Sequence, residues 1–300
     1  MTKRLASLSL DLDNKWSYMK THGDAGWESF PSYLDVVVPR VLELLDARGL
    51  KITFFVVGQD AALDKNREAL SAIAEAGHEI GNHSFRHEPW LHLYGRKELA
   101  EELSRAEEAI ERVVGVKPVG FRGPGYSFSP PLLEELARRG YEYDASTLPT
   151  FLGPVARAYY FFRSELKQTE RQQRKRLFGK LSDGFRPLRL YVWPDLCRDL
   201  VEVPVTTMPL LKLPFHMSYL LYLAQYSERL AMSYFQAALS LCRMTGVEPS
   251  LLLHPLDFLG GDDDGDLAFF PAMQLPSARK LRFVEAALER FARLPRSAPS

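Results

Sequence analysis

The first 140 residues alternate between two hydrophobic periods, one typical of strands and the other of helices. Residues 5–12 (LASLSLDL) alternate apolar and polar side chains, and residues 51–58 (KITFFVVG) form a β-branched and aromatic run, so both predict strands. A short strand and turn are expected at HEIGNH, and a strand entering a loop at residues 118–125. Apolar residues recur at helical spacing in four segments, residues 33–49, 67–77, 96–115 and 129–140.

This alternation is typical of an α/β fold in which βαβ units surround a parallel sheet or barrel. In such folds the chemistry gathers at the carboxyl ends of the strands. Five polar residues follow or close predicted strands, and these are Asp11, Asp13, His83, Arg122 and His254. We therefore expect the five side chains to share one site.

Two later segments depart from the pattern. Residues 157–189 contain ten basic and three acidic residues and a run of aromatic ones, which predicts a helical basic insertion or lid within a single domain spanning residues 1–300. Residues 210–242 are apolar and predict a buried helix, which Glu228 and Arg229 interrupt. No internal repeat is evident.

Composition narrows the function classes. The chain has 300 residues, of which 46% are hydrophobic, and 38 basic residues balance 38 acidic ones, so net charge gives no bias toward nucleic acid. Cys197 and Cys242 lie far apart, which favours buried thiols over a disulfide framework or a zinc knuckle. We see neither an export signal nor a stretch of about 18 uncharged apolar residues, so the cytoplasm is the expected location.

His83 and His87 stand four positions apart in the stretch GNHSFRH. On a helix or helical turn, residues i and i+4 share a face, so the two imidazoles can converge on one point. Zinc accepts imidazole nitrogen and usually takes a further protein ligand. A pair of surface histidines on a turn is the alternative, and a metal site requires further ligands from other segments.

The stretch LDLD supplies two carboxylates at strand spacing. Residues i and i+2 of a strand point to the same face, so Asp11 and Asp13 can both reach the site. One can bind a metal while the other takes a proton from water that the metal has made acidic. The alternative is an ordinary strand-end turn, where aspartate is common.

Three further residues fit a hydrolytic site. Arg122, in FRGPGYSFS, can lower the pKa of a neighbouring carboxylate and fix its orientation, and the open loop after it can aim a backbone N–H at an oxyanion. Asp144 lies in YEYDAST and His254 in SLLLHPLD, and a histidine held by an aspartate is a natural general acid. The alternatives are a surface turn for Arg122 and a structural role for His254.

Two loops carry weaker signals. Residues 14–30 form a long aromatic loop in which Trp16 and Trp27 can stack on sugars, and His22 and Asp24 can join the site, although such loops also simply pack. The run GGDDDGD (260–266) lacks the spacing and final glutamate of a calcium-binding EF-hand, so a solvated acidic loop is expected.

Taken in order, SLDLD, GNHSFRH, FRGPGYSF, YDAST and LLLHP resemble the five motifs of the polysaccharide deacetylases, the chitooligosaccharide deacetylase-like members of carbohydrate esterase family 4. The resemblance spans residues 5–258. It implies a distorted (β/α)7 barrel and a divalent metal, with Zn²⁺ expected first and Co²⁺, Ni²⁺, Mn²⁺ or Fe²⁺ as alternatives.

The resemblance also implies a role for each matching residue. Asp13, His83 and His87 would be the metal ligands, Asp11 the catalytic base and Arg122 the residue that positions Asp11. Asp144 would tune His254, which would protonate the leaving amine. Ser84 would brace the histidine turn, and the backbone N–H of Tyr126 would bind the oxyanion.

Departures from the family pattern bear on the substrate. The first motif is Asp-x-Asp, the third reads Gly-Pro-Gly-Tyr, and the fourth has Thr147 and Leu148 where tryptophan is usual. With the HPLD ending (254–257), this set resembles the deformylases and deacetylases of polyprenyl-phosphate-linked aminosugars. The implied reaction is hydrolysis of an N-acetyl or N-formyl group of an aminosugar.

Partners and rival functions follow from these features. The basic, aromatic 157–189 segment suits contact with the inner face of a membrane, and a solvated lid helix is the alternative. The rival functions are a cyclic amidase of purine catabolism and a non-catalytic carbohydrate- or metal-binding homologue. Oligomeric state is left open.

Overall fold

The chain folds around one eight-stranded sheet whose order is β6-β7-β5-β4-β3-β2-β1-β8. The structure is a computed structural model that describes residues 7–153, 180–194, 196 and 199–294. The strands are β1 (Ser7–Leu12), β2 (Thr53–Val56), β3 (Glu79–Asn82), β4 (Gly120–Phe121), β5 (Tyr143–Asp144), β6 (Tyr191–Val192), β7 (Val201–Glu202) and β8 (Ser250–Leu253). Neighbouring strands run parallel except β6 and β7, which pair antiparallel.

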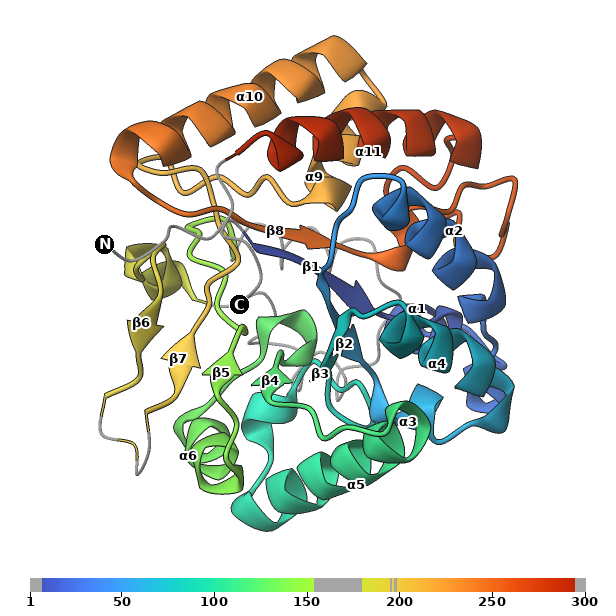
Figure 1. Ribbon diagram of the computed structural model, residues 1–300, viewed down its shortest axis with the longest axis vertical. Coiled ribbons are helices and arrows are strands. Elements are labelled where there is room, and N and C mark those ends of the chain that lie inside the picture. The colour runs from blue at the N-terminus through green and yellow to red at the C-terminus, as the bar shows by residue number, and fades with distance from the viewer. Residues whose placement is uncertain (1–6, 154–179, 195, 197–198, 295–300) are drawn as a thin grey trace.

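Helices surround the curled sheet, as Figure 1 shows. The α-helices among the described residues are α1 (Lys15–His22), α2 (Leu34–Asp46), α3 (Gly58–Ala61), α4 (Arg67–Glu75), α5 (Arg96–Val114), α6 (Pro130–Arg139), α9 (Met217–Ala224), α10 (Glu228–Thr245) and α11 (Ser277–Ala292). The 3-10 turns are η1 (Trp27–Ser29), η2 (Asp64–Asn66), η3 (Leu91–Leu93), η4 (Pro124–Tyr126), η6 (Leu181–Phe185) and η7 (Pro255–Asp257).

The two sides of the sheet are bridged where the chain leaves β7. The backbone N–H of Thr206 donates to the carbonyl of Ser250, the first residue of β8, at 3.0 Å. This bond curls the sheet toward closure, and the predicted distorted barrel is confirmed. The expected insertion at residues 157–189 falls mostly outside the described residues, because these omit residues 154–179.

Strand β1 turns its polar side chains inward. Its leucines, Leu8, Leu10 and Leu12, are buried in the main hydrophobic cluster together with side chains of α2 and α11. Each buried leucine contributes about 1.5–3 kcal/mol of transfer free energy, so this face fixes the orientation of the strand. Because strand side chains alternate, Asp11 points to the interior of the barrel.

Two segments differ from their predicted structure. Residues 14–30 were expected to form a loop, but they begin with helix α1, because the Asn14 side chain accepts the backbone N–H of Lys15 at 2.8 Å as its N-cap. Residues 210–242 cover two helices, α9 and most of α10, rather than one. Ser227 separates them by capping the first turn of α10, where its side chain accepts the N–H of Leu230.

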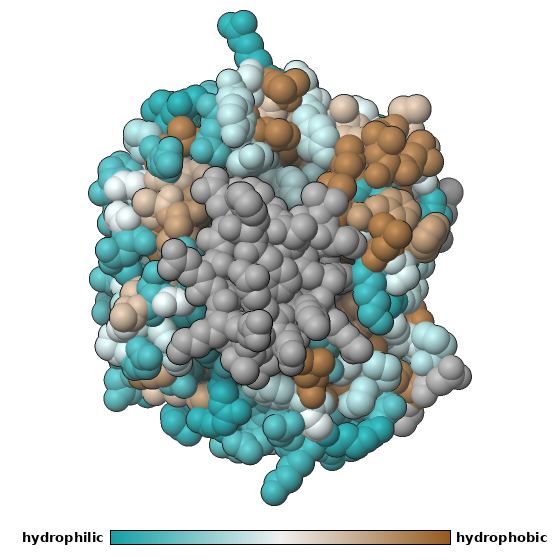
Figure 2. Space-filling view, turned by 180° about the vertical axis from the view of Figure 1, so that it is seen from behind, coloured by the Kyte–Doolittle hydropathy of each residue, from teal (hydrophilic) through white to brown (hydrophobic). Residues whose placement is uncertain are grey.

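Several large apolar side chains are exposed. Phe185 is 80% exposed and Leu210 is 78% exposed. Figure 2 shows apolar side chains on the face seen from behind, beside the residues drawn in grey. Within the described ranges, no helix has both the length and the apolar character needed to span a bilayer. Cys242 is buried as expected, whereas Cys197 lies outside the described residues.

Candidate metal centre and active site

Asp13, His83 and His87 form a cluster that could hold a metal ion. One ligand atom from each residue lies within 4.8 Å of the others. Asp13 Oδ1 is 2.9 Å from His87 Nε2 and 3.3 Å from His83 Nε2. Asp13 Oδ1 and both ring nitrogens of His87 are buried without a hydrogen bond of good geometry to the described residues. Buried polar atoms left in this way fit a divalent cation, and two imidazoles with one carboxylate are a ligand set typical of catalytic zinc.

The histidines converge through a tight turn rather than a helical one. His83 directly follows β3, and two residues of the turn have left-handed backbones, Ser84 with φ 61° and His87 with φ 52°. The side chain of Asn82 accepts the N–H of Ser84 at 2.8 Å, and the Ser84 hydroxyl accepts the N–H of His87 at 3.2 Å. The two rings therefore meet through a tight turn after a strand, and not through the helical spacing considered for the pair.

Glu102 of α5 holds the same turn and was missed by the sequence analysis. Its Oε1 accepts the backbone N–H groups of Phe85 at 3.0 Å and Arg86 at 2.6 Å, and the residue is fully buried. The sequence does contain a signal that Glu102 is buried, because Glu102 lies three residues after Leu99 and four before Ala106 on the apolar face of an amphipathic helix. A carboxylate on an apolar face requires buried donors.

Hydrogen bonds prepare His83 as a ligand. Its Nδ1 lies 2.7 Å from the backbone carbonyl of Arg122, which can only accept, so Nδ1 carries the proton and Nε2 offers its lone pair toward Asp13. Burial favours the neutral form of Asp13, but the nearby His87 and His83 hold the pKa of Asp13 well below its ordinary value. The Asp13 carboxylate is therefore ready to bind a cation.

Asp11 is the second buried carboxylate of β1 and lies against Arg122. Arg122 Nη1 donates to Asp11 Oδ1 at 2.7 Å and to Ser9 Oγ at 3.0 Å, and its Nε donates to the carbonyl of Ala145 at 2.9 Å. The guanidinium also stacks over Phe55, with 4.2 Å between its carbon and the ring centroid. Asp11 Oδ2 lies on the cluster side, 3.9 Å from His83 Nε2. Arg122 thus orients one oxygen of Asp11 and leaves the other facing the cluster.

His254 lies beside β1 at the same end of the barrel. Leu10 of β1 pairs with Leu253 of β8, so the next residues, Asp11 near the end of β1 and His254 directly after β8, lie at the same end of adjacent parallel strands. His254 Nδ1 is 3.1 Å from the Ser218 hydroxyl, and the backbone N–H of His254 donates to Asp257 at 2.8 Å. The structure therefore brings His254 to the end of the sheet that carries Asp11.

Asp144 does not take the position expected beside His254. In the pairing of β4 with β5, Phe121 lies opposite Asp144 and Gly120 lies opposite Tyr143. Paired residues share a face, so Asp144 lies on the outer face with Phe121, which packs among side chains of α5 and α6. Arg122 follows Phe121 and points to the opposite face. The position of Asp144 along β5 therefore explains why it faces away from the side of the sheet that carries Arg122.

The described contacts of Asp144 lie elsewhere. Its Oδ1 accepts the Ser146 hydroxyl at 2.5 Å, and it pairs in the sheet with Glu202 of β7. Burial raises the pKa of both carboxyl groups, which hydrogen-bond each other. Two buried acids in contact share a proton, and the described contacts of Asp144 are with Ser146 and Glu202 and do not include His254.

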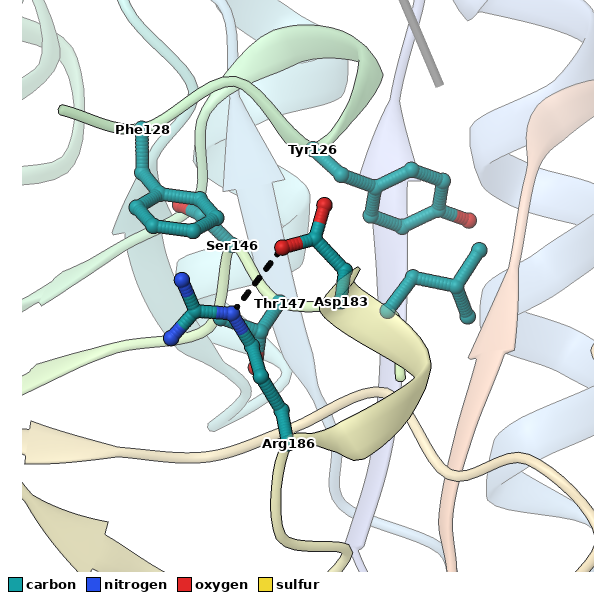
Figure 3. A pocket seen from close by; sticks show the side chains of 7 residues that line it. Tyr126, Phe128, Ser146, Thr147, Asp183 and Arg186 are labelled. Atoms are coloured by element: carbon teal, nitrogen blue, oxygen red, sulfur yellow. Dashed lines mark hydrogen bonds and ion pairs between the residues drawn. The ribbon is translucent and has the colours of Figure 1, made fainter. Parts of the chain in front are cut away.

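The backbone N–H of Tyr126 is already bonded, contrary to its expected role as an oxyanion donor. It donates to the carbonyl of Gly123 at 3.0 Å within η4, a tight turn in which Tyr126 has φ 61°. In this conformation Tyr126 instead presents its ring to a pocket, drawn in Figure 3. The residues lining the pocket are Tyr126, Phe128, Ser146, Thr147, Leu148, Asp183 and Arg186.

Arg186 forms the polar wall of this pocket. Its Nε donates to Asp183 at 3.2 Å, and its guanidinium lies over the ring of Phe128 at 4.7 Å. Thr147 and Leu148, the residues found where the family pattern has tryptophan, also line the pocket. Phe128 and Tyr126 supply aromatic surface of the kind on which a sugar ring can pack.

The aromatic residues of segment 14–30 divide into buried and exposed ones. Trp16 is only 1% exposed, and its Nε1 donates to the buried Asp60 at 2.9 Å, so the expectation of a sugar contact is wrong for Trp16. Trp27 is partly exposed, with the Lys20 ammonium 5.1 Å from its ring. His22 stacks on Phe269 with 3.8 Å between ring centroids.

Asp24 and the acidic loop complete the weaker predictions. The His22 Nδ1 lies 2.8 Å from Asp24, and neither residue belongs to the metal cluster found among the described residues. The acidic run 260–266 is used in ion pairs, because Asp264 binds Lys15 at 2.8 Å and Asp263 binds Arg40 at 2.8 Å.

Comparison with protein families gives one match. The family model described as polysaccharide deacetylase matches residues 24–143. A peptidoglycan deacetylase of Helicobacter pylori is 28% identical over 151 residues, which cover 48% of this chain and 50% of that protein. The peptidoglycan-N-acetylmuramic acid deacetylase PdaA of Bacillus subtilis is 31% identical over 37% of this chain and 41% of its own length. This chain thus spans half or less of these relatives.

Solved structures share the fold over nearly the whole chain. A structure from Mycobacterium smegmatis assigned to the polysaccharide deacetylases has a TM-score of 0.59 at 20% identity, covering 96% of this chain and 85% of that one. A similarly assigned structure from Pseudomonas aeruginosa has a TM-score of 0.57 at 19% identity, covering 97% and 84%. These structures confirm the predicted fold, and the match of residues 24–143 to the family model confirms the predicted family resemblance.

Proposed function

We propose that this chain, whose residues 24–143 match the polysaccharide deacetylase family model, is a metal-dependent hydrolase that removes the N-acyl group from an aminosugar. One observation carries the proposal. The buried Asp11, oriented by Arg122 at 2.7 Å, lies beside the three converging side chains of Asp13, His83 and His87. A proton acceptor next to a ligand set of this kind is the arrangement that amide hydrolysis requires.

Asp13, His83 and His87 would hold the divalent metal, which we propose to be Zn²⁺. The buried Asp13 Oδ1 and His87 ring nitrogens, which lack hydrogen bonds of good geometry, and the proton on His83 Nδ1 that directs Nε2 inward, support this assignment. When bound, the metal would acidify water and polarise the acyl carbonyl.

The residues of the chain would move the protons of the reaction. Asp11 Oδ2, the oxygen that Arg122 does not engage, would accept a proton from the water that attacks the acyl carbon. As the carbon–nitrogen bond breaks, His254 would donate a proton to the amine nitrogen. The products are a carboxylic acid and a free aminosugar.

The substrate we propose is an N-acetylated aminosugar of a glycan or a glycan precursor. The Helicobacter pylori and Bacillus subtilis relatives are named for acting on peptidoglycan, which favours N-acetyl over N-formyl groups. Tyr126, Phe128 and Arg186, which line a small pocket, would contact one edge of the sugar, because the aromatic rings offer packing surface and the guanidinium offers donors.

A lipid-linked form of this substrate is our finer proposal. Exposed apolar residues lie next to basic ones on the described surface: Phe185 precedes Arg186, and Leu210 and Leu211 precede Lys212. The Lys212 ammonium donates to the Arg186 carbonyl at 2.7 Å, which joins the two segments into one apolar-basic surface. Apolar side chains beside cationic ones suit an anionic membrane interface.

Mass spectrometry of reaction products tests the function. The metal-loaded protein would be incubated with N-acetylated peptidoglycan fragments and with polyprenyl-phosphate N-acetyl- and N-formyl-aminosugars. We expect loss of the acyl mass from at least one of these substrates with wild type and not with Asp11→Asn. An unchanged mass for every substrate would contradict the proposal.

Vesicle co-sedimentation tests the lipid-linked form. We expect wild type to sediment with vesicles containing anionic lipid, and the double substitution Phe185→Ser with Leu210→Ser to sediment less. Val116→Ser is the matched control, because Val116 is 57% exposed and lies after α5. Equal sedimentation of all three proteins, or of vesicles with and without anionic lipid, would contradict membrane contact.

A further inference from the structure

His254 is held by two residues that no motif assigned to it, Ser218 and Asp257. Ser218 belongs to the first turn of α9, and Asp257 ends the turn η7 that follows β8. The Ser218 hydroxyl lies 3.1 Å from His254 Nδ1 and 2.7 Å from Asp257 Oδ1. The three side chains therefore form a chain of polar contacts that ends at the imidazole.

The hydrogen-bond donors in this chain can be counted. Asp257 Oδ2 accepts the backbone N–H of His254 at 2.8 Å, and Asp257 Oδ1 accepts the Ser218 hydroxyl at 2.7 Å. A hydroxyl has one proton, so once Ser218 donates to the carboxylate it can only accept from His254. The Nδ1 of His254 must then carry the proton, and the neutral ring keeps its lone pair on Nε2.

The surrounding packing fixes Ser218 and Asp257 in place. The flanking residues Met217 and Leu220 of α9 are buried in the main core, which sets the direction of Ser218. Behind η7, the buried Lys280 of α11 donates to the carbonyls of Leu256 at 2.6 Å and Leu259 at 2.8 Å. The turn that carries Asp257 is thus tied to a helix on the outside of the barrel.

The charged and titratable neighbours of His254 leave Asp257 as its partner. His216 lies 5.8 Å away between ring centroids, and burial together with His254 lowers the pKa of His216 to about 3, so it stays neutral. Burial raises the pKa of Asp257, while His254, Ser218 and Lys280 act in the opposite direction.

We propose that Ser218 and Asp257 are positioning residues that keep one proton on His254 Nδ1, so that Nε2 is the nitrogen that takes up a second proton from solvent and gives it to the leaving amine. This inference rests on the proposed function and deepens it by naming what supports the general acid. In free imidazole the two nitrogens compete for the single proton, and a partner at one nitrogen decides which tautomer the ring adopts. This Asp257–Ser218–His254 relay takes the role toward His254 that the family resemblance implied for Asp144.

Nitrogen NMR of protein labelled at histidine reads the tautomer without any assay of activity. We expect wild-type His254 to have a protonated Nδ1, and Ser218→Ala to lose this preference. Ser218→Thr retains a hydroxyl and should restore it. Ser240→Ala, an exposed serine of α10, is the matched control. A wild-type ring protonated at Nε2, or a Ser218→Ala spectrum identical to wild type, would overturn the relay.

Asp257→Asn makes a sharper prediction, because the amide oxygen must still accept the backbone N–H of His254. The amide nitrogen then faces Ser218 and donates to its hydroxyl, which in turn donates to His254 Nδ1. We expect the tautomer to reverse, with the proton moving to Nε2. Retention of the Nδ1 proton in this variant would contradict the proposed order of donors.

Leaving-group dependence provides the kinetic test. An amine must be protonated as it leaves, whereas a nitrophenolate need not be, so Ser218→Ala should lower kcat about 10–100-fold on an N-acetylaminosugar and less than about threefold on nitrophenyl acetate. Equal losses on both substrates would overturn the positioning role. A wild type inactive on both would refute the proposed function, while the NMR result would still decide the relay.

Discussion

The two halves of the candidate site are built in different ways. The half formed by β1, β3 and β4 contains Asp11 within β1, and Asp13, His83 and Arg122 directly after their strands. The pairing of these strands places all four residues at one end of the sheet. The half around His254 depends on one strand, β8, together with a helix and a turn that supply Ser218 and Asp257. Strand ends place side chains by register alone, whereas the second half depends on how α9 and α11 pack.

The largest expected effect lies in the strand-built half. His83→Ala removes a ligand whose Nδ1 is already fixed on the Arg122 carbonyl at 2.7 Å, so we expect loss of bound metal and of detectable turnover. Metal analysis and product mass spectrometry measure the two losses. Chelation of wild type should reproduce both, and added Zn²⁺ should restore activity to wild type only. Full activity after chelation would break the account of this half.

Asp11→Asn should have the next largest effect. The substitution keeps the shape of the side chain and its contact with Arg122 but removes the proton acceptor, so we expect kcat to fall about 10²–10⁴-fold with metal content unchanged. Turnover and metal analysis on the same preparation provide the measurement. A variant that loses metal together with activity would move Asp11 from the role of base to that of ligand.

Asp144→Asn should have a small effect on turnover, because Asp144 belongs to neither half of the site. Asp144 shares a proton with Glu202 on the outer face of the sheet, and the amide oxygen of asparagine can still accept that proton from Glu202. We expect kcat to change less than about threefold, the scatter typical of a residue outside the chemistry. A loss as large as that of a general acid, about 10²-fold or more, would restore Asp144 as the partner of His254.

Most of the strand-built half could be predicted from sequence, because two-residue spacing and position at a strand end are local properties. Asp11 and Asp13 followed from alternation alone. The left-handed backbones of Ser84 and His87 could not be predicted in the same way, because a turn of this kind depends on the buried Glu102 of a later helix.

The half of the site around His254 could not be predicted from sequence, for physical reasons. Strand β5 has two residues, Tyr143–Asp144, so a shift of one position decides which face Asp144 occupies, and no pattern of that length fixes it. Ser218 lies 36 positions from His254, and nothing in its neighbourhood marks it. Trp16 is expected in a loop, but Asn14 caps a helix that begins at Lys15, and Trp16 is buried in that helix.

The smallest expected effect concerns stability far from the site. Burial lowers the pKa of His78 from 6.5 to about 4, and its Nδ1 accepts the backbone N–H of Ile52 at 3.2 Å. Between these values the unfolded chain binds a proton that the folded chain does not, so the free energy of unfolding falls as pH decreases. His78→Asn keeps an acceptor without titrating, and should flatten this fall by ~2 kcal/mol.

Urea unfolding of wild type and His78→Asn, at matched pH values between neutral and mildly acidic, measures this difference. His83 and the other histidines are present in both proteins, so the comparison isolates His78. Parallel curves for the two proteins would show that the imidazole of His78 protonates freely in the folded state.

The central claim is that Asp13, His83 and His87 hold one divalent metal. Metal analysis of the purified protein, loaded with Zn²⁺ and desalted, tests it most directly when wild type, His83→Ala and Asp144→Asn are compared. The account predicts one equivalent of zinc in wild type and in Asp144→Asn, and none in His83→Ala. Equal retention by all three proteins, or no retention by wild type, would contradict it.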